Sequence, residues 1–86
     1  MKLGVIGAGN MGGAIVRGVT AGGFLPGAEI GVADVLKDKA ETLCAQTGAR
    51  AISDNAQIAR ESDWVLLAVK PIFAEGVLRE IAPHMG

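Results

Sequence analysis

The sequence predicts an α/β fold built on a parallel β-sheet. Short apolar runs alternate with helical patterns in the order β-α-β-α-β-α-β-α, a glycine-rich turn follows the first run, and turn residues separate the elements. Right-handed crossovers, with the glycine turn on the first strand, favour the strand order 3-2-1-4. The sequence therefore predicts a Rossmann-like sheet that is truncated after its fourth strand.

The first half of the chain predicts two strands and two helices. Residues 2–6 are apolar on both faces, as in the middle of a covered parallel sheet. A helix is expected over residues 10–22, followed by a strand over residues 29–34 and a helix from about residue 36 or 37 to 47 that Gly48 ends. The inward face of the first helix is expected to consist of Met11, Ile15, Gly18, Val19 and Gly22.

The second half predicts two further strands, each followed by a helix. A brief strand is expected over residues 50–52. Asp54 and Gln57 are spaced as in a capping box ahead of a short helix, with Ser53 as a competing cap. The longest apolar run, residues 64–69, predicts another buried strand, and a last helix is expected over residues 73–81.

Composition and charge exclude several classes of protein. The 8 basic and 9 acidic residues form no basic patch, so no nucleic-acid partner is expected. No apolar run approaches the roughly 18 residues that span a bilayer, and the N-terminus lacks a signal-peptide pattern. We therefore expect a cytoplasmic protein with no membrane contact. Cys44 lies on a buried helical stripe and His84 follows Pro83, so neither predicts a catalytic or metal site.

The glycine turn spans Gly7 to Gly12 and matches the pattern G-x-G-x-x-G between a strand and a helix. Gly7 suits the tight turn, Gly9 leaves room for a pyrophosphate near the backbone, and Gly12 lets the helix pack close to its strand. Phosphates would then lie at the helix N-terminus, where the helix dipole favours negative charge. The alternative is a turn with a structural role alone.

Asp34 closes the second predicted strand 22 residues after Gly12, near the spacing of about 20 residues at which an acidic residue binds the adenosine ribose. The alternatives are a helix cap and a solvated carboxylate. A carboxylate here repels the 2′-phosphate of NADP, and Val35 cannot supply the usual arginine. Lys37 or Lys39 could compensate if the loop curls over the phosphate, but Asp34 and Val35 favour NAD.

Two further candidates lie on the same rim of the sheet. The turn Ala68-Val69-Lys70-Pro71 leaves the fourth predicted strand, where Pro71 would fix the backbone beside a nicotinamide ring. Its alternative is a simple strand end. Asn55 follows the third strand and could reach the adenosine half of a cofactor, although helix capping explains it equally well.

Together these motifs resemble the N-terminal domain of the pyrroline-5-carboxylate reductase family. The resemblance rests on Ile6 to Gly12, on Asp54-Asn55 and on Leu67 to Pro71, and it covers essentially the whole chain. It implies an NAD(P)-dependent oxidoreductase that passes a hydride to 1-pyrroline-5-carboxylate and gives L-proline, with NADPH as the common cofactor. The implied cofactor contacts are Ile6, Gly7, Ala8, Gly9, Asn10, Met11, Asn55, Ala68, Val69, Lys70 and Pro71.

Two departures from the family qualify this prediction. The family often has arginine or a small polar residue where this chain has Val35 and Leu36, so cofactor preference stays open. The family also continues into a helical domain that dimerises and completes the substrate pocket. We expect residues 1–86 to form the dinucleotide-binding domain of a homo-oligomeric enzyme and to be inactive alone. The rival interpretations are a cofactor domain of the hydroxyacid or 6-phosphogluconate dehydrogenase type and a free-standing dinucleotide-sensing module.

Overall fold

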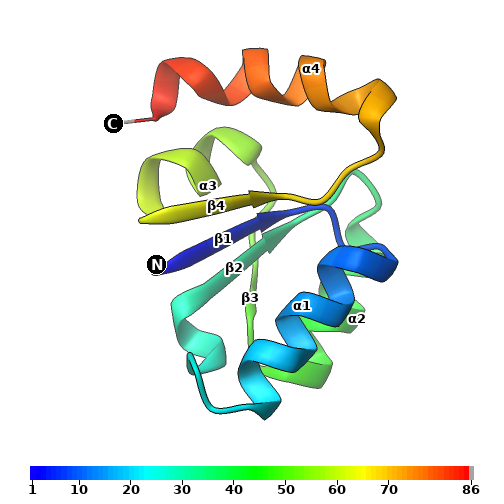
Figure 1. Ribbon diagram of the computed structural model, residues 1–86, viewed down its shortest axis with the longest axis vertical. Coiled ribbons are helices and arrows are strands. Elements are labelled where there is room, and N and C mark those ends of the chain that lie inside the picture. Colours follow the sequence, from blue (N-terminus) through cyan, green and yellow to red (C-terminus); the bar gives the residue numbers. More distant parts are fainter. Residues whose placement is uncertain (86) are drawn as a thin grey trace.

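The computed structural model describes residues 1–85 and shows a four-stranded parallel sheet covered by helices (Figure 1). The strands are β1 (Leu3–Ile6), β2 (Ile30–Ala33), β3 (Arg50–Ala51) and β4 (Trp64–Leu67). The helices are α1 (Asn10–Ala21), α2 (Lys37–Thr47), α3 (Asn55–Glu61) and α4 (Pro71–Ile81), with short 3-10 helices at Gly27–Glu29 and Ala82–His84. The strand order is β3-β2-β1-β4, so the predicted fold and the order 3-2-1-4 are confirmed.

The central strand β1 aligns the ends of its two neighbours. Ile6 is in register with Ala33 of β2 on one side and with Leu67 of β4 on the other. The ladder continues one step further, because Gly7 N–H donates to the Ala33 carbonyl and Ala68 N–H donates to the Ile6 carbonyl, both at 2.8 Å. The glycine turn and the segments that follow β2 and β4 therefore leave the sheet at the same edge.

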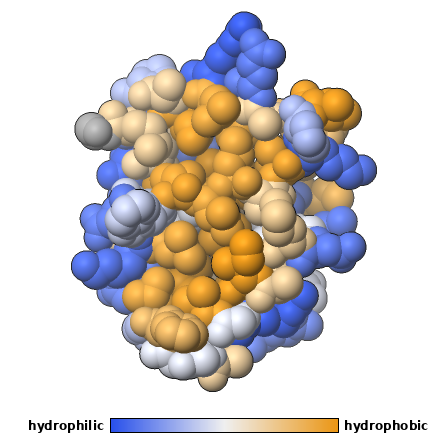
Figure 2. Space-filling model, viewed as in Figure 1, coloured by the Kyte–Doolittle hydropathy of each residue, from blue (hydrophilic) through white to orange (hydrophobic). Residues whose placement is uncertain are grey.

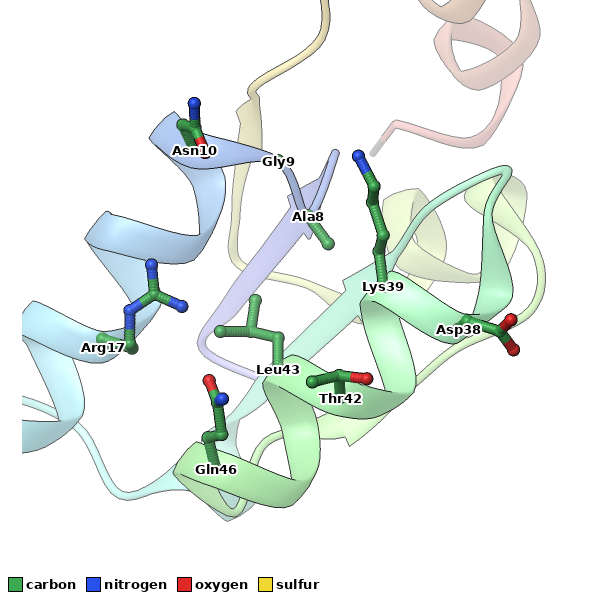
Figure 3. Close-up of a pocket in the computed structure, with 9 residues that line it drawn as sticks. All are labelled: Ala8, Gly9, Asn10, Arg17, Asp38, Lys39, Thr42, Leu43 and Gln46. Carbon is green, nitrogen blue, oxygen red and sulfur yellow. The ribbon is translucent and has the colours of Figure 1, made fainter.

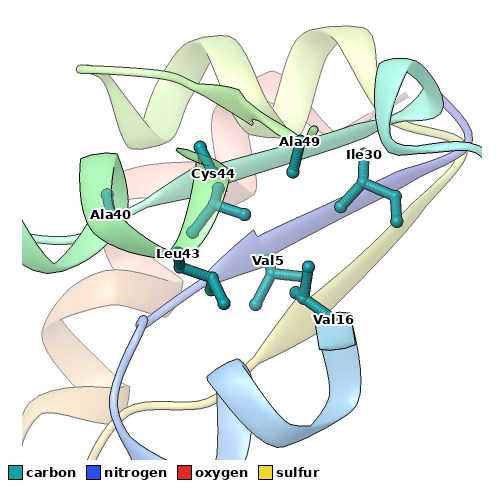
Figure 4. Close-up of a cluster of buried hydrophobic side chains, with 8 residues drawn as sticks. Val5, Val16, Ile30, Ala40, Leu43, Cys44 and Ala49 are labelled. Atoms are coloured by element: carbon teal, nitrogen blue, oxygen red, sulfur yellow. The ribbon is translucent and has the colours of Figure 1, made fainter. Parts of the chain in front are cut away.

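Two hydrophobic clusters cover the two faces of the sheet. Val5 of β1 packs with Val16 of α1 and Leu43 of α2 on one face (Figure 4). The next residue along β1, Ile6, packs with Ile58 of α3 and Ile81 of α4 on the other. This alternation follows the two-residue period of a strand. Full burial of each Val or Ile side chain contributes roughly 1.5–3 kcal/mol of stability.

The inward face of α1 differs from the predicted one. Its buried residues are Gly12, Gly13 and Val16. Of the predicted residues, Ile15 and Val19 are half-buried and Val19 packs against the core, whereas Met11 (56%), Gly18 and Gly22 are exposed. A methyl group at Gly12 would collide with the carbonyl oxygen of Gly7, so α1 approaches the backbone that follows β1 closely at this glycine. Close backbone approach, and not the apolar spacing, therefore sets the rotation of α1.

Strand β4 is shorter and more exposed than predicted. It ends at Leu67, and among residues 1–85 it pairs with β1 alone, so it forms an edge of the sheet. Trp64 is 75% exposed and the rest of the strand is half-buried. Figure 2 shows apolar surface on the face of the molecule where β4 runs between α4 and α1. An apolar run of this length predicts a strand, but it does not tell whether both of its edges are paired.

The predicted helix ends are largely confirmed. Gly48 ends α2 in the left-handed conformation with a φ of 79°, and its N–H donates to the Cys44 carbonyl at 2.8 Å. The N-cap of α3 is Asp54, whose carboxylate accepts from Ala56 N–H at 2.9 Å. Ser53, the competing cap, is not used. Over residues 1–85, every helix is too short or too polar to cross a membrane.

Candidate functional site

The glycine turn links β1 to α1 with a different constraint at each glycine. Gly7 has a φ of 110°, a conformation that side chains disfavour, and a methyl group there would collide with the Ala68 carbonyl oxygen. Gly12 packs against Gly7, as described above. Gly9 is different, because its backbone is extended, with a φ of −75° and a ψ of −157°, and a methyl group would meet no atom within 4 Å. Among residues 1–85, no neighbouring atom requires a glycine at position 9, and the space beside its Cα is open.

That open space lies at the N-terminus of α1, a helix of 12 residues. Gly9 is the N-cap, and no side chain caps the helix. The first N–H groups of a helix have no partner within it, and here the helix dipole adds partial positive charge. The turn therefore offers hydrogen-bond donors and room to an anionic group such as a phosphate.

Asp34 follows β2 and is fixed by two backbone N–H groups. Its Oδ2 accepts from Ala8 at 2.7 Å and its Oδ1 accepts from Leu36 at 2.8 Å. The residue is half-buried, and the N-cap of α2 is Leu36. Asp34 is therefore neither of the two alternatives considered from the sequence, a helix cap or a solvated carboxylate. It holds the glycine turn against the end of β2 and still has lone pairs for a ligand hydroxyl.

A groove of about 530 Å³ opens at this edge of the sheet. Eight of the predicted site residues line it: Ile6, Gly7, Gly9, Asp34, Asn55, Ala68, Val69 and Lys70. The structure thus brings the glycine turn together with the ends of β2 and β4 and the start of α3. Sheets of this kind bind ligands at the carboxyl ends of their strands, beside the point where the strand order reverses.

The remaining predicted residues lie beside the groove. Ala8 and Asn10 line a second hollow between α1 and α2, which shares Gly9 and Lys39 with the groove (Figure 3). Met11 and Gly12 continue α1 away from the turn. Pro71 is the first residue of α4, which therefore begins two residues earlier than predicted. The turn from Ala68 to Pro71 thus leads from the end of β4 directly into a helix.

Helix α4 also contributes to the groove, which was not predicted from the sequence. Four residues of α4 line the side of the groove that lies across the sheet from α1: Phe73, Gly76, Val77 and Glu80. Phe73 is 57% exposed, so it lies open on the groove and is not part of the core. In the sequence, Pro71 alone indicated this contribution of α4. Proline favours the first position of a helix, so it predicts a helix that starts at the carboxyl edge of the sheet.

Glu80 also contacts a predicted site residue. The side-chain amide of Asn55 donates from Nδ2 to Glu80 Oε1 at 2.9 Å. Asn55 is the first residue of α3, next to its N-cap, and caps nothing itself. The capping alternative for Asn55 is therefore wrong, and the cap is Asp54.

The charged groups near the groove are few. Lys39 and Lys70 line it together with Asp34 and Glu80, whereas Lys37 lines a smaller hollow on the far side of Asp34. Val35 is 93% exposed at the mouth and carries no charge. Among residues 1–85, no three His, Cys, Asp or Glu side chains are grouped as metal ligands would be.

The two residues set aside from the sequence lie away from the groove. Cys44 lies on the buried face of α2, and this burial raises the pKa of its thiol. His84 lies in the 3-10 helix after α4, with Nδ1 at 3.4 Å from an Arg60 nitrogen.

Comparison with known proteins matches this chain over nearly its whole length. The family model described as "NADP oxidoreductase coenzyme F420-dependent" matches residues 2–85. A pyrroline-5-carboxylate reductase of Methanosarcina acetivorans is 42% identical over 80 residues, which are 93% of this chain and 30% of that protein.

Solved structures show the same resemblance. A pyrroline-5-carboxylate reductase from Coxiella burnetii has a TM-score of 0.87 and 35% identity, covering 95% of this chain and 30% of that one. The Plasmodium falciparum enzyme, solved with NADP bound, has a TM-score of 0.83 and 30% identity over 98% of this chain and 29% of that one. The chain spans about 30% of the length of these relatives. The resemblance read from the motifs is therefore confirmed, and the chain belongs to the family of coenzyme F420-dependent NADP oxidoreductases.

Proposed function

We propose that this chain binds the nicotinamide dinucleotide of a pyrroline-5-carboxylate reductase. The observation that carries the proposal is the groove in which the glycine turn, Asp34, Asn55 and Lys70 meet at one edge of the sheet. Its relatives of known structure include an enzyme with NADP bound. A reduced nicotinamide supplies the hydride in such enzymes, and the residues of this chain bind and orient it.

The residues present fit such a cofactor. The pyrophosphate would lie on the N–H groups at the start of α1, in the space that a side chain at Gly9 would fill. The adenosine ribose would lie beside Asp34 and Asn55, where oxygen atoms can accept from its hydroxyls. Ala68, Val69 and Lys70 line the opposite part of the groove and would border the nicotinamide half.

The cofactor that this geometry favours is NADH. Asp34 is held at the mouth of the groove by two N–H groups, and the neighbouring Val35 and Leu36 are exposed and uncharged. A carboxylate there repels the 2′-phosphate of NADPH and accepts from the 2′-hydroxyl of NADH. A homo-oligomeric enzyme and a cytoplasmic location stay predictions from the sequence.

The proposed reaction reduces the C=N bond of 1-pyrroline-5-carboxylate to L-proline. In this proposal the described residues hold the cofactor, and no acid or base is assigned among them. The test is a chimera in which this chain replaces the segment it matches in the Methanosarcina acetivorans enzyme. We expect oxidation of NADH or NADPH that depends on 1-pyrroline-5-carboxylate, whereas the 86-residue chain alone should bind cofactor and turn over nothing.

Two results would contradict the proposal. A folded chimera that binds cofactor but oxidises NADH or NADPH only when it reduces an oxoacid to a hydroxyacid would favour the rival dehydrogenase class. A chain that binds neither dinucleotide in a calorimetric titration would remove the cofactor role altogether.

A further inference from the structure

Asn55 and Glu80 meet at the wall of the groove from two different helices. Asn55 begins α3, and Glu80 lies in the last turn of α4, 25 residues further along the chain. Their side chains are joined by the 2.9 Å hydrogen bond from Asn55 Nδ2 to Glu80 Oε1. Both residues line the same groove as Asp34. The bond therefore belongs to the ligand-facing surface and not to the interior of the protein.

A carboxylate partner decides which way the amide of Asn55 points. An ionised carboxylate only accepts hydrogen bonds, so it must face the NH₂ group of the amide. Turning the amide by half a rotation would place Asn55 Oδ1 against Glu80 Oε1, where the two oxygens repel each other. With Nδ2 committed to Glu80, Oδ1 has no hydrogen-bond partner among residues 1–85 and is available as an acceptor.

We propose that Glu80 is a positioning residue for cofactor binding, which holds the Asn55 amide so that its oxygen accepts from a ribose hydroxyl. This inference rests on the proposed function, since it assigns the ligand of the same groove. Asp34 supplies carboxylate oxygens and Asn55 supplies an amide oxygen to the two hydroxyls of one sugar. Without Glu80 the amide could turn and present its NH₂ group to the sugar. A ribose hydroxyl that donates its proton needs an acceptor, and the NH₂ group of the amide is only a donor.

The proposal can be separated from a merely structural role. Ile81 is the buried residue of α4, whereas Glu80 is exposed, so loss of the Glu80 charge should leave the packing of the helix intact. The same helix carries a matched control. Glu75 pairs with Arg79 across one turn of α4, both side chains are exposed, and neither lines the groove. Glu75→Gln therefore removes a carboxylate from α4 without touching Asn55.

The experiment is a double-mutant cycle on the 86-residue chain, with the Kd for NADH measured by calorimetry. Glu80→Gln preserves the shape of the side chain but accepts either orientation of the amide, and it should raise the Kd about three- to tenfold. Asn55→Ala should raise the Kd by at least as much. Adding Glu80→Gln to Asn55→Ala should change nothing further, because Glu80 acts through Asn55. Glu75→Gln should leave the Kd unchanged, and thermal melts should show that all variants fold.

Three results would overturn the inference in distinguishable ways. An unchanged Kd for Glu80→Gln would show that the amide needs no positioning. Independent, additive losses in the double variant would show that Glu80 touches the cofactor itself. A wild-type chain that binds neither NADH nor NADPH would refute the proposed function and the inference with it.

Discussion

The backbone N–H of Ala8 donates a 2.7 Å hydrogen bond to Oδ2 of Asp34, a residue 26 positions later in the chain. This bond ties the middle of the glycine turn to the end of β2. The second carboxylate oxygen accepts from Leu36 N–H at 2.8 Å, so both oxygens are held before any ligand arrives. The residue that we propose to recognise the ribose therefore also shapes the turn that would receive the pyrophosphate.

Asp34→Asn should shift the cofactor preference towards NADPH. At a partly solvated site, repulsion between a carboxylate and a 2′-phosphate is about 1–2 kcal/mol, so the ratio of the NADPH Kd to the NADH Kd should fall about tenfold. The amide can replace only one of the two acceptor oxygens, so the free energy of unfolding should also fall by about 1 kcal/mol. Calorimetric titrations and denaturant melts measure both changes. An unaltered ratio of the two Kd values would mean that Asp34 does not select the cofactor.

Lys39 should carry whatever affinity the chain has for NADPH. It is the lysine that lines both the groove and the adjoining hollow at the glycine turn, whereas Lys37 lines neither. Lys39→Ala should raise the Kd for NADPH about threefold and leave that for NADH nearly unchanged, as expected for a solvated ion pair. Lys37→Ala is the matched control and should affect neither. Equal effects of the two substitutions would place the 2′-phosphate elsewhere.

Three of the glycines in α1 and its turn should respond to substitution in three different ways. Gly9→Val should abolish binding of both dinucleotides and lower the stability by only about 1 kcal/mol, because the space beside Gly9 is open but valine is a poorer N-cap than glycine. Gly12→Ala should cost about 2 kcal/mol or more, because the new methyl group meets the Gly7 carbonyl oxygen. Gly18→Ala, at an open and exposed helical position, should stabilise the chain by about 0.5–1 kcal/mol and leave binding unchanged.

Melting curves and cofactor titrations on the same three proteins separate these effects. Wild-type affinity in Gly9→Val would reduce the turn to a structural feature. That was the alternative left open by the sequence.

The glycine turn, the end of α2 and the N-cap of α3 could be predicted from the sequence, because each depends on local spacing or on the conformational freedom of glycine. Gly48 and Asp54 illustrate this, since each acts on groups within a few residues of itself. The strand order followed from the handedness of the crossovers. The rotation of α1 could not be read in this way. The apolar spacing favoured Met11, but the backbone contact at Gly12 turns Met11 outward to 56% exposure.

Only some of the residues that line the groove could be predicted from the sequence. Asp34 and Asn55 carry polar side chains at strand ends, so their chemistry and position both pointed to the rim. Glu80 lies on the last helix and reaches the rim only because α4 folds back beside α3. Its role depends on a contact between residues 25 positions apart, and nothing in the residues around it indicates that contact.

Ser62→Ala should raise the free energy of unfolding by about 1 kcal/mol, because the hydroxyl of Ser62 is buried without a hydrogen-bond partner in residues 1–85. A methyl group at Gly4 would collide with this hydroxyl and would lie 2.6 Å from Ile58 Cγ2. Gly4→Ala should therefore destabilise the chain by about 1–3 kcal/mol. Ser53→Ala, at an exposed serine, is the control for the loss of a hydroxyl and should change little. Denaturant unfolding measures all three, and a destabilised Ser62→Ala variant would reveal a partner for the hydroxyl.

Cys44 should make the stability of the chain fall at alkaline pH. Burial raises the pKa of its thiol above the ordinary value of 9.0, so as pH rises the unfolded chain loses this proton before the folded chain does. Stability from this residue is complete below pH 9 and decreases as pH rises from there through the folded-state pKa, by at most about 1.4 kcal/mol per pH unit. Cys44→Ala should be less stable at neutral pH, since it leaves a small cavity, but should lack this part of the slope. Equal slopes in both proteins between pH 8 and pH 10, measured by denaturant unfolding in steps of about one unit, would show that the thiol titrates alike in the folded and unfolded chains.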